Sequence, residues 1–164
     1  MPEIIPLGWF HTVTGIVALV SGVITLFKYK EISYRNLSGV IYLVTTLITA
    51  ATALMIFQHG GFGVAHAMGV AALIALAVGM LAEARKLFGK WSRHIQAFSF
   101  SATLLFHCLP AVTDGLLRLP VGDPILTSIN DPIMQASHLA LFIAFLIGVA
   151  IQLRWIQHQA KASA

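Results

Sequence analysis

Long stretches without any charged residue are the feature that most limits what this chain can fold into. Four of them contain at least 19 residues each: Leu37–Gln58, Val64–Ala82, His94–Thr113 and Ile133–Leu153. A run of about 18 or more apolar residues is typical of a membrane-spanning segment. Because a backbone inside lipid must satisfy its own hydrogen bonds, we expect these segments to be helices. Only 10% of the 164 residues are charged, whereas soluble domains average about 25%.

A fifth apolar stretch lies near the N-terminus. It lacks the basic start, the short apolar core and the small-residue cleavage pattern of a signal peptide, so we interpret it as a span. The sequence therefore predicts an all-α integral membrane bundle, one domain over residues 1–164, with five transmembrane helices. Their expected ranges are Leu7–Phe27, Leu37–Gln58, Val64–Ala84, Ser92–Thr113 and Ile133–Leu153.

The basic residues predict how this bundle is oriented. Nine of the 10 lysines and arginines follow the first, third or fifth span, and only Arg118 lies in the long fourth connection. That connection instead holds Asp114, Asp123 and Asp131. The positive-inside rule then places the N-terminus outside and the C-terminus inside. The basic charge is thus explained by topology, so we expect a lipid environment and no nucleic-acid partner.

Four of the seven histidines lie in the outer part of a predicted span. They are His11, His66, His107 and His138. An ionisable residue inside a membrane span is costly and marks a candidate functional site, although a single histidine can also simply bond a neighbouring helix. Imidazole is the commonest metal ligand and the usual protein ligand of haem iron. We therefore interpret these four residues as the candidate cofactor or metal ligands.

A haem b with two axial histidines is the first cofactor that this pattern favours. Counting along the predicted helices puts His107 and His138 at matching depth, which makes them the preferred pair. His11 and His66 form either a second pair or hydrogen bonds to the haem carboxylates. Gly15 starts a small-residue stripe beside His11, which gives a flat macrocycle room, although such stripes also occur in ordinary close helix packing.

A bare copper, zinc or non-haem iron ion held by the same histidines is the alternative. The charge-free stretches contain no aspartate or glutamate, so a carboxylate-bridged pair of metals is not expected. Cys108 is the only cysteine and is interpreted as apolar filling.

Three segments give the chain a family resemblance: "FHTVTGIVALVSGVITL", "SGVIYLVTTLITAATAL" and "RHIQAFSFSATLLFHCLPAVTDGLLRLP". They resemble a family of small bacterial predicted membrane proteins of unknown function. At the start of the second segment that family often carries a histidine before a glycine, and this chain has none there. The placement of histidines across a small bundle is also similar to that of membrane b-type cytochromes, as an architectural analogy. The resemblance implies a bacterial cytoplasmic (inner) membrane.

These observations together predict a membrane haem protein that transfers electrons near the outer face. Its partners would be a redox protein or a larger membrane complex, such as a respiratory complex of which it is a subunit. A cofactor-free structural subunit remains an alternative. The sequence has no Ser-His-Asp order, phosphate loop or paired carboxylates, so any enzymatic role would be that of a redox component rather than a hydrolase or transferase.

Overall fold

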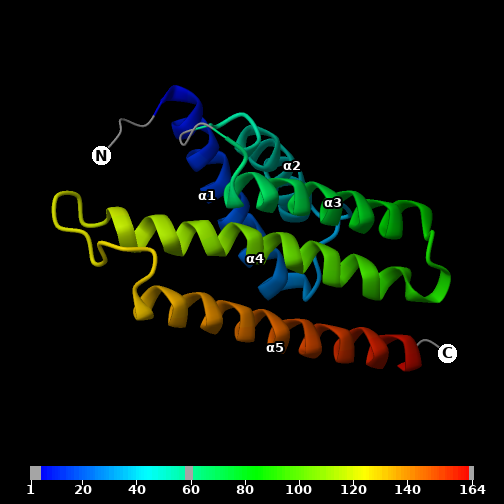
Figure 1. Ribbon diagram of the computed structural model, residues 1–164. Coiled ribbons are helices and arrows are strands. Elements are labelled where there is room, and N and C mark those ends of the chain that lie inside the picture. Colours follow the sequence, from blue (N-terminus) through cyan, green and yellow to red (C-terminus); the bar gives the residue numbers. More distant parts are fainter. Residues whose placement is uncertain (1–4, 58–60, 163–164) are drawn as a thin grey trace.

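Every regular element in the described residues, 5–57 and 61–162 of this computed structural model, is a helix. This confirms the all-α prediction. The described residues form five α-helices and one short 3-10 turn, and Figure 1 shows how the helices are arranged. They are α1 (Pro6–Tyr29), α2 (Leu37–Ala53), α3 (Val64–Arg85), η1 (Gly89–Trp91), α4 (Ser92–Arg118) and α5 (Pro132–Ala162).

Four of these helices are long and apolar enough to cross a membrane, namely α1, α3, α4 together with η1, and α5. Helix α2 has only 17 residues, a length of about 25 Å. It was expected to run to Gln58, which lies outside the described residues. It ends earlier because the Leu54 and Met55 amides turn back to the carbonyls of Ala51 and Thr52, which closes the last turn.

The other two differences lengthen helices. Helix α4 continues past Thr113 to Arg118, and an ion pair of 3.1 Å between Arg118 Nε and Asp114 Oδ1 spans the added turn. Helix α5 begins where Asp131 Oδ1 accepts the Ile133 N–H at 2.8 Å, with Pro132 in the first turn. It extends nine residues beyond the predicted end, because the polar segment after Leu153 is rich in residues that favour helix, such as arginine, glutamine, alanine and lysine.

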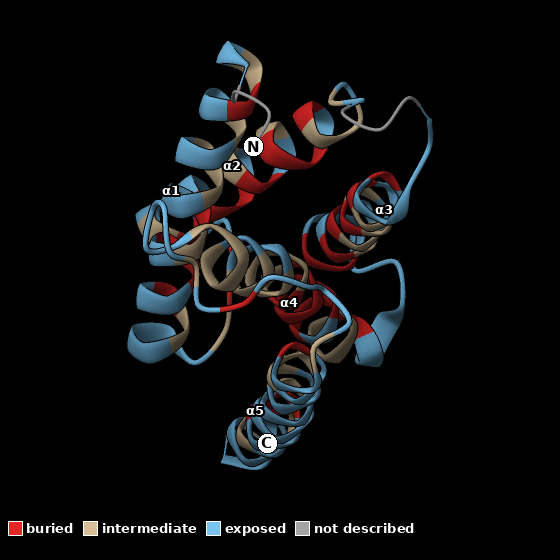
Figure 2. Cartoon of the chain, turned by 60° about the vertical axis from the view of Figure 1, so that its left-hand side comes forward, coloured by how far each residue is buried: buried red, intermediate tan, exposed pale blue. Residues whose placement is uncertain are grey.

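Helix α4 is the central element of the bundle. It packs against α3 and α5 and touches α1, while α1 packs along α2 and α2 contacts α3. Figure 2 shows buried residues concentrated on α2, α3 and α4, whereas most of α5 is exposed. The exposed side of α5 is apolar, with side chains such as Phe142 and Ile147, as expected of a surface that faces lipid.

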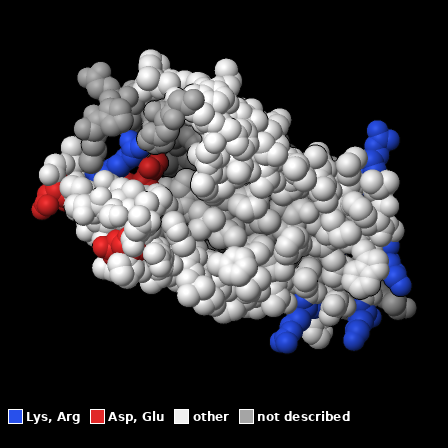
Figure 3. Space-filling model, viewed as in Figure 1, with Lys and Arg blue, Asp and Glu red and all other residues white. Residues whose placement is uncertain are grey.

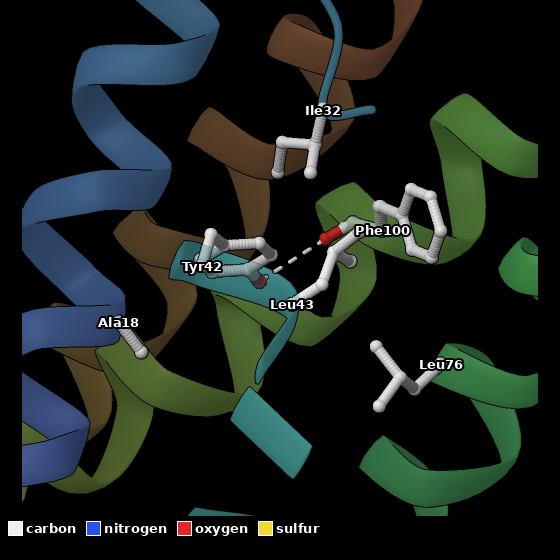
Figure 4. Close-up of a cluster of buried hydrophobic side chains, with 6 residues drawn as sticks. All are labelled: Ala18, Ile32, Tyr42, Leu43, Leu76 and Phe100. Carbon is white, nitrogen blue, oxygen red and sulfur yellow. Dashed lines mark hydrogen bonds between the residues drawn. The ribbon is translucent and has the colours of Figure 1, made fainter. Parts of the chain in front are cut away.

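The core lies where α1, α2, α3 and α4 come together. Figure 4 shows Tyr42 and Phe100 pointing into this region, with the Tyr42 hydroxyl directed at the Phe100 carbonyl. Glycines allow the helices to approach closely. A Cβ atom on Gly79 would lie 2.3 Å from Phe100 Cε1, and one on Gly22 would lie 2.7 Å from Tyr42 Cδ2. Both large rings therefore occupy space that exists only because these two positions have no side chain.

The two ends of the bundle differ in charge. Figure 3 shows lysine and arginine side chains at one end, acidic side chains beside a small basic patch at the other, and a long surface free of charge between them. We call the end where α1, α3 and α5 finish the basic end, and the opposite end the histidine end.

Buried polar contacts tie the link between α1 and α2 to the other helices at the basic end. Gln96 of α4 donates to the Ile32 carbonyl at 2.9 Å, and Gln152 of α5 donates to the Lys30 carbonyl at 2.7 Å. The Gln152 side-chain oxygen also accepts from Ser101 Oγ at 2.9 Å. Because buried polar groups are costly without partners, these contacts fix α4, α5 and the link in one arrangement.

Candidate histidine site

A row of buried hydroxyl groups runs along one face of α2. It consists of Tyr42, Thr46, Thr49 and Thr52, which follow each other at intervals of four, three and three residues and so share a helix face. We call this row the α2 polar stripe. Thr49 donates to Thr14 of α1 at 3.1 Å, and the stripe contacts α4 through Tyr42. Histidines from both neighbouring helices bond to it.

His11 of α1 bonds to the end of this stripe. Its Nδ1 lies 3.0 Å from Thr52 Oγ1. The Thr52 hydroxyl proton is already directed at the Ile48 carbonyl, 2.9 Å away. With the Thr52 proton on that carbonyl, the Thr52 oxygen accepts from His11 Nδ1, and the lone pair of the ring is then on Nε2. A histidine that donates through one ring nitrogen and keeps the other free has the arrangement of a metal ligand.

His107 of α4 bonds to the middle of the stripe. Its Nε2 lies 3.1 Å from Thr46 Oγ1, and the edge of the Tyr42 ring packs against the imidazole. The hydroxyl groups beside it are linked to one another and to α4. The Tyr42 and Thr103 hydroxyl oxygens share a hydrogen bond of 2.6 Å, and each hydroxyl also lies within hydrogen-bond distance of the Phe100 carbonyl. These bonds hold the Tyr42 ring that positions His107.

His138 of α5 bonds to a different helix. Its Nε2 lies 2.8 Å from Thr113 Oγ1 of α4, and the Thr113 proton is directed at the Leu109 carbonyl at 2.9 Å. With the Thr113 proton on that carbonyl, His138 donates through Nε2, and its lone pair is then on Nδ1.

His66, in the first turn of α3, accepts a hydrogen bond through one ring nitrogen and needs an acceptor for the other. Its Nδ1 accepts the Gly63 N–H at 3.2 Å, so the ring proton is on Nε2. That nitrogen is buried and has no partner among the described residues. The rings of Phe57 and Phe62 pack on the imidazole, with centroids 4.5 and 5.2 Å away. His66 is thus a buried donor without an acceptor rather than a free lone pair.

The four histidines do not lie at one depth. This differs from the sequence analysis, which put His107 and His138 at matching depth. Thr113, the partner of His138, is six residues beyond His107 on α4, which is about 9 Å along the axis and on a different face. His11 and His107 both bond to threonines of α2, and these partners, Thr52 and Thr46, are likewise six residues apart, about 9 Å along the α2 axis. Within residues 5–57 and 61–162, no three histidine, cysteine, aspartate or glutamate side chains are grouped to hold one metal ion.

Gly15 lies on the side of α1 that faces the stripe. A Cβ atom there would be 3.5 Å from Thr49 Cγ2. The small-residue stripe of α1 thus packs directly on α2, with Gly15 against Thr49 and Gly22 against Tyr42. In this arrangement α2 occupies the side of α1 that was expected to give a macrocycle room.

Charged groups line a hollow at the histidine end. Figure 3 shows basic and acidic side chains together inside this hollow. Asp114 and Arg118 form their ion pair at this end, and Asp114 is close enough to His11 to interact with it electrostatically. His11 therefore lies between the apolar interior and a charged opening.

The hydroxyl partners of the histidines were not expected from the sequence. The signal that could have revealed them is the spacing of threonines in "TTLITAAT", where Thr46, Thr49 and Thr52 share one helix face. His59, which belongs to the uncharged connection between α2 and α3, lies outside the described residues.

The role of Thr52 gives a direct test of the His11 assignment. Replacing Thr52 by valine should remove the acceptor and let the His11 ring proton move between its two nitrogens, whereas Thr52→Ser should preserve the native tautomer. Nitrogen-15 NMR of histidine-labelled protein in detergent reports the tautomer. Identical His11 spectra for the wild type and Thr52→Val would show that this hydrogen bond does not set the tautomer.

No protein-family model, curated protein or solved structure that was compared with this chain matches it.

Proposed function

We propose that this chain is an integral membrane protein that holds a haem b in the outer half of the bilayer and transfers electrons near the outer face. The observation that carries the proposal is that two histidines from different helices, His11 of α1 and His107 of α4, both bond to buried threonines of α2. Its electron-transfer partner would be another redox protein or the rest of a larger membrane complex.

The charge distribution supports the orientation within this proposal. Lysine and arginine gather at the basic end (Figure 3), which the positive-inside rule assigns to the cytoplasm of a bacterial inner membrane. The N-terminus and the histidine end then face outward. Helix α2 would be the fifth span, and its length of about 25 Å is near the lower limit for crossing the hydrocarbon core.

His11 and His107 are the residues that would hold the haem iron. The free Nε2 of His11 and its Thr52 partner suit an iron ligand, because ligating histidines usually donate their second nitrogen to a fixed acceptor. His107 would exchange its contact with Thr46 for the iron. His66, whose buried Nε2–H lacks an acceptor, suits a hydrogen bond to a haem carboxylate. When bound, haem iron would supply one-electron chemistry at a potential set by these ligands and by burial.

The absorption spectrum of the purified protein tests this proposal. Protein produced with ample haem is expected to show a Soret band, and a pyridine haemochrome assay is expected to identify haem b. Elemental analysis of the same sample separates the alternatives. Copper, zinc or iron without porphyrin would replace the proposal with a bare metal site, and a sample with neither would replace it with a cofactor-free structural subunit.

A further inference from the structure

A second polar site lies at the basic end, far from the histidines. It is a half-open cavity of about 530 Å³ between the α1–α2 link, the end of α3, η1 and the start of α4. Its lining includes six charged side chains, which are Glu31, Arg35, Glu83, Lys86, Lys90 and Arg93. Hydrogen bonds of Glu83 and Arg93 hold the end of α3 and the start of α4 to the α1–α2 link around this cavity.

Both carboxylates of the cavity are already neutralised by protein groups. Glu31 accepts two hydrogen bonds from Arg93, at 2.9 and 3.0 Å, in a bidentate ion pair. Glu83, whose side chain is only 3% exposed, accepts from the Ser33 hydroxyl and from the Tyr34 amide at 3.3 Å. Arg35 Nε lies 3.8 Å from the same carboxylate.

Lys86 and Lys90 are the two cations of the cavity lining that have no carboxylate partner among the described residues. The backbone brings them together, because Lys86 ends α3 with a φ of 49° and Gly89 turns the chain with a φ of 55°. Since four cations face two carboxylates that are already paired, the cavity carries an excess of positive charge.

We propose that this cavity binds a phosphate group, carried by the headgroup of an anionic phospholipid. Lysine binds phosphate as a point charge, and basic pockets between membrane helices suit acidic headgroups. The residues next to the cavity favour a lipid as the source of the phosphate. Leu87 follows Lys86 and Trp91 follows Lys90, and they are 63% and 57% exposed, as expected of apolar side chains that reach the membrane interface.

Lipid binding by the purified protein tests this proposal. In detergent, phosphatidylglycerol is expected to raise the melting temperature, while phosphatidylcholine is not. The double variant Lys86→Gln/Lys90→Gln is expected to bind phosphatidylglycerol at least tenfold more weakly, because each lysine contributes a sizeable share of such attraction. A dissociation constant from native mass spectrometry or a melting titration measures this change.

The control is Lys28→Gln/Lys161→Gln, which removes the same charge at the basic end but away from the cavity lining. It is expected to keep nearly all of the affinity. An equal loss in both double variants, or an equal response to phosphatidylcholine, would overturn the proposal.

Inorganic phosphate is tested separately. If it protects as well as the lipid and only the cavity variant loses the effect, the phosphate site stands and its ligand is the free ion. Both lysines are exposed, so the variants are expected to fold, and their melting temperatures without lipid check this.

Discussion

Replacing Gly39 by alanine is expected to lower the free energy of unfolding by about 3 kcal/mol, or to prevent folding. The added Cβ would lie only 2.0 Å from the Ser33 backbone carbonyl oxygen, and a backbone cannot move aside as a flexible side chain can. It would also crowd Asn36 Oδ1, which caps α2 by accepting the Gly39 N–H at 2.8 Å. Losing such a cap alone costs about 1 kcal/mol.

Thermal unfolding in detergent, followed by circular dichroism, measures this effect. Gly148→Ala is the matched control, because a Cβ atom at that position of α5 meets nothing within 4 Å. It is expected to change the free energy of unfolding by about 0.5 kcal/mol or less. Equal melting temperatures for the two variants would show that the tight contact between α2 and its preceding link is not needed for stability.

The second large effect is on cofactor content and rests on the proposed haem function. Changing either His11 or His107 to alanine is expected to remove most of the Soret absorbance per mole of protein, because each would lose one axial ligand. The free lone pair of His11 and the shared stripe beneath both rings are the structural reasons for choosing this pair. The measurement is the ratio of haem to folded protein after purification.

Matched histidine variants separate ligands from bystanders. His94→Ala and His158→Ala alter histidines at the basic end and are expected to retain haem. His66→Ala is expected to keep the band but to bind haem more weakly. A complete loss with His138→Ala and none with His11→Ala would favour the pairing of His107 with His138 that helix counting suggested, and would contradict the pairing proposed from the structure.

The helices could be predicted from the sequence because a membrane imposes one strong rule on the backbone. Uncharged stretches of sufficient length must be helical, and α1 and α3 begin and end within two residues of the predicted limits. That rule does not determine where a helix stops at its polar end. Helix α4 gains a turn from the Asp114–Arg118 pair, and α2 is shortened by a turn that closes within an apolar segment, where hydropathy gives no signal.

The site was less predictable, because depth along a helix says nothing about which face a residue occupies relative to its neighbours. Counting residues suggested that His107 and His138 were level. The structure places His107 against Thr46 and His138 against Thr113, on different faces of the bundle. Threonine is common in membrane helices as an ordinary packing residue, so its role as the partner of a histidine becomes visible only once the helices are packed.

The contrast between the two ends also determines how the bundle could open. At the basic end, Gln96 and Gln152 bind backbone carbonyls of the α1–α2 link, and Arg93 clamps Glu31. At the histidine end, the bonds to α2 join uncharged side chains: His11–Thr52 and Thr14–Thr49 from α1, and His107–Thr46 from α4. We therefore expect any parting of the helices to begin at the histidine end. A large flat guest could enter there while the lysine-lined cavity keeps its shape.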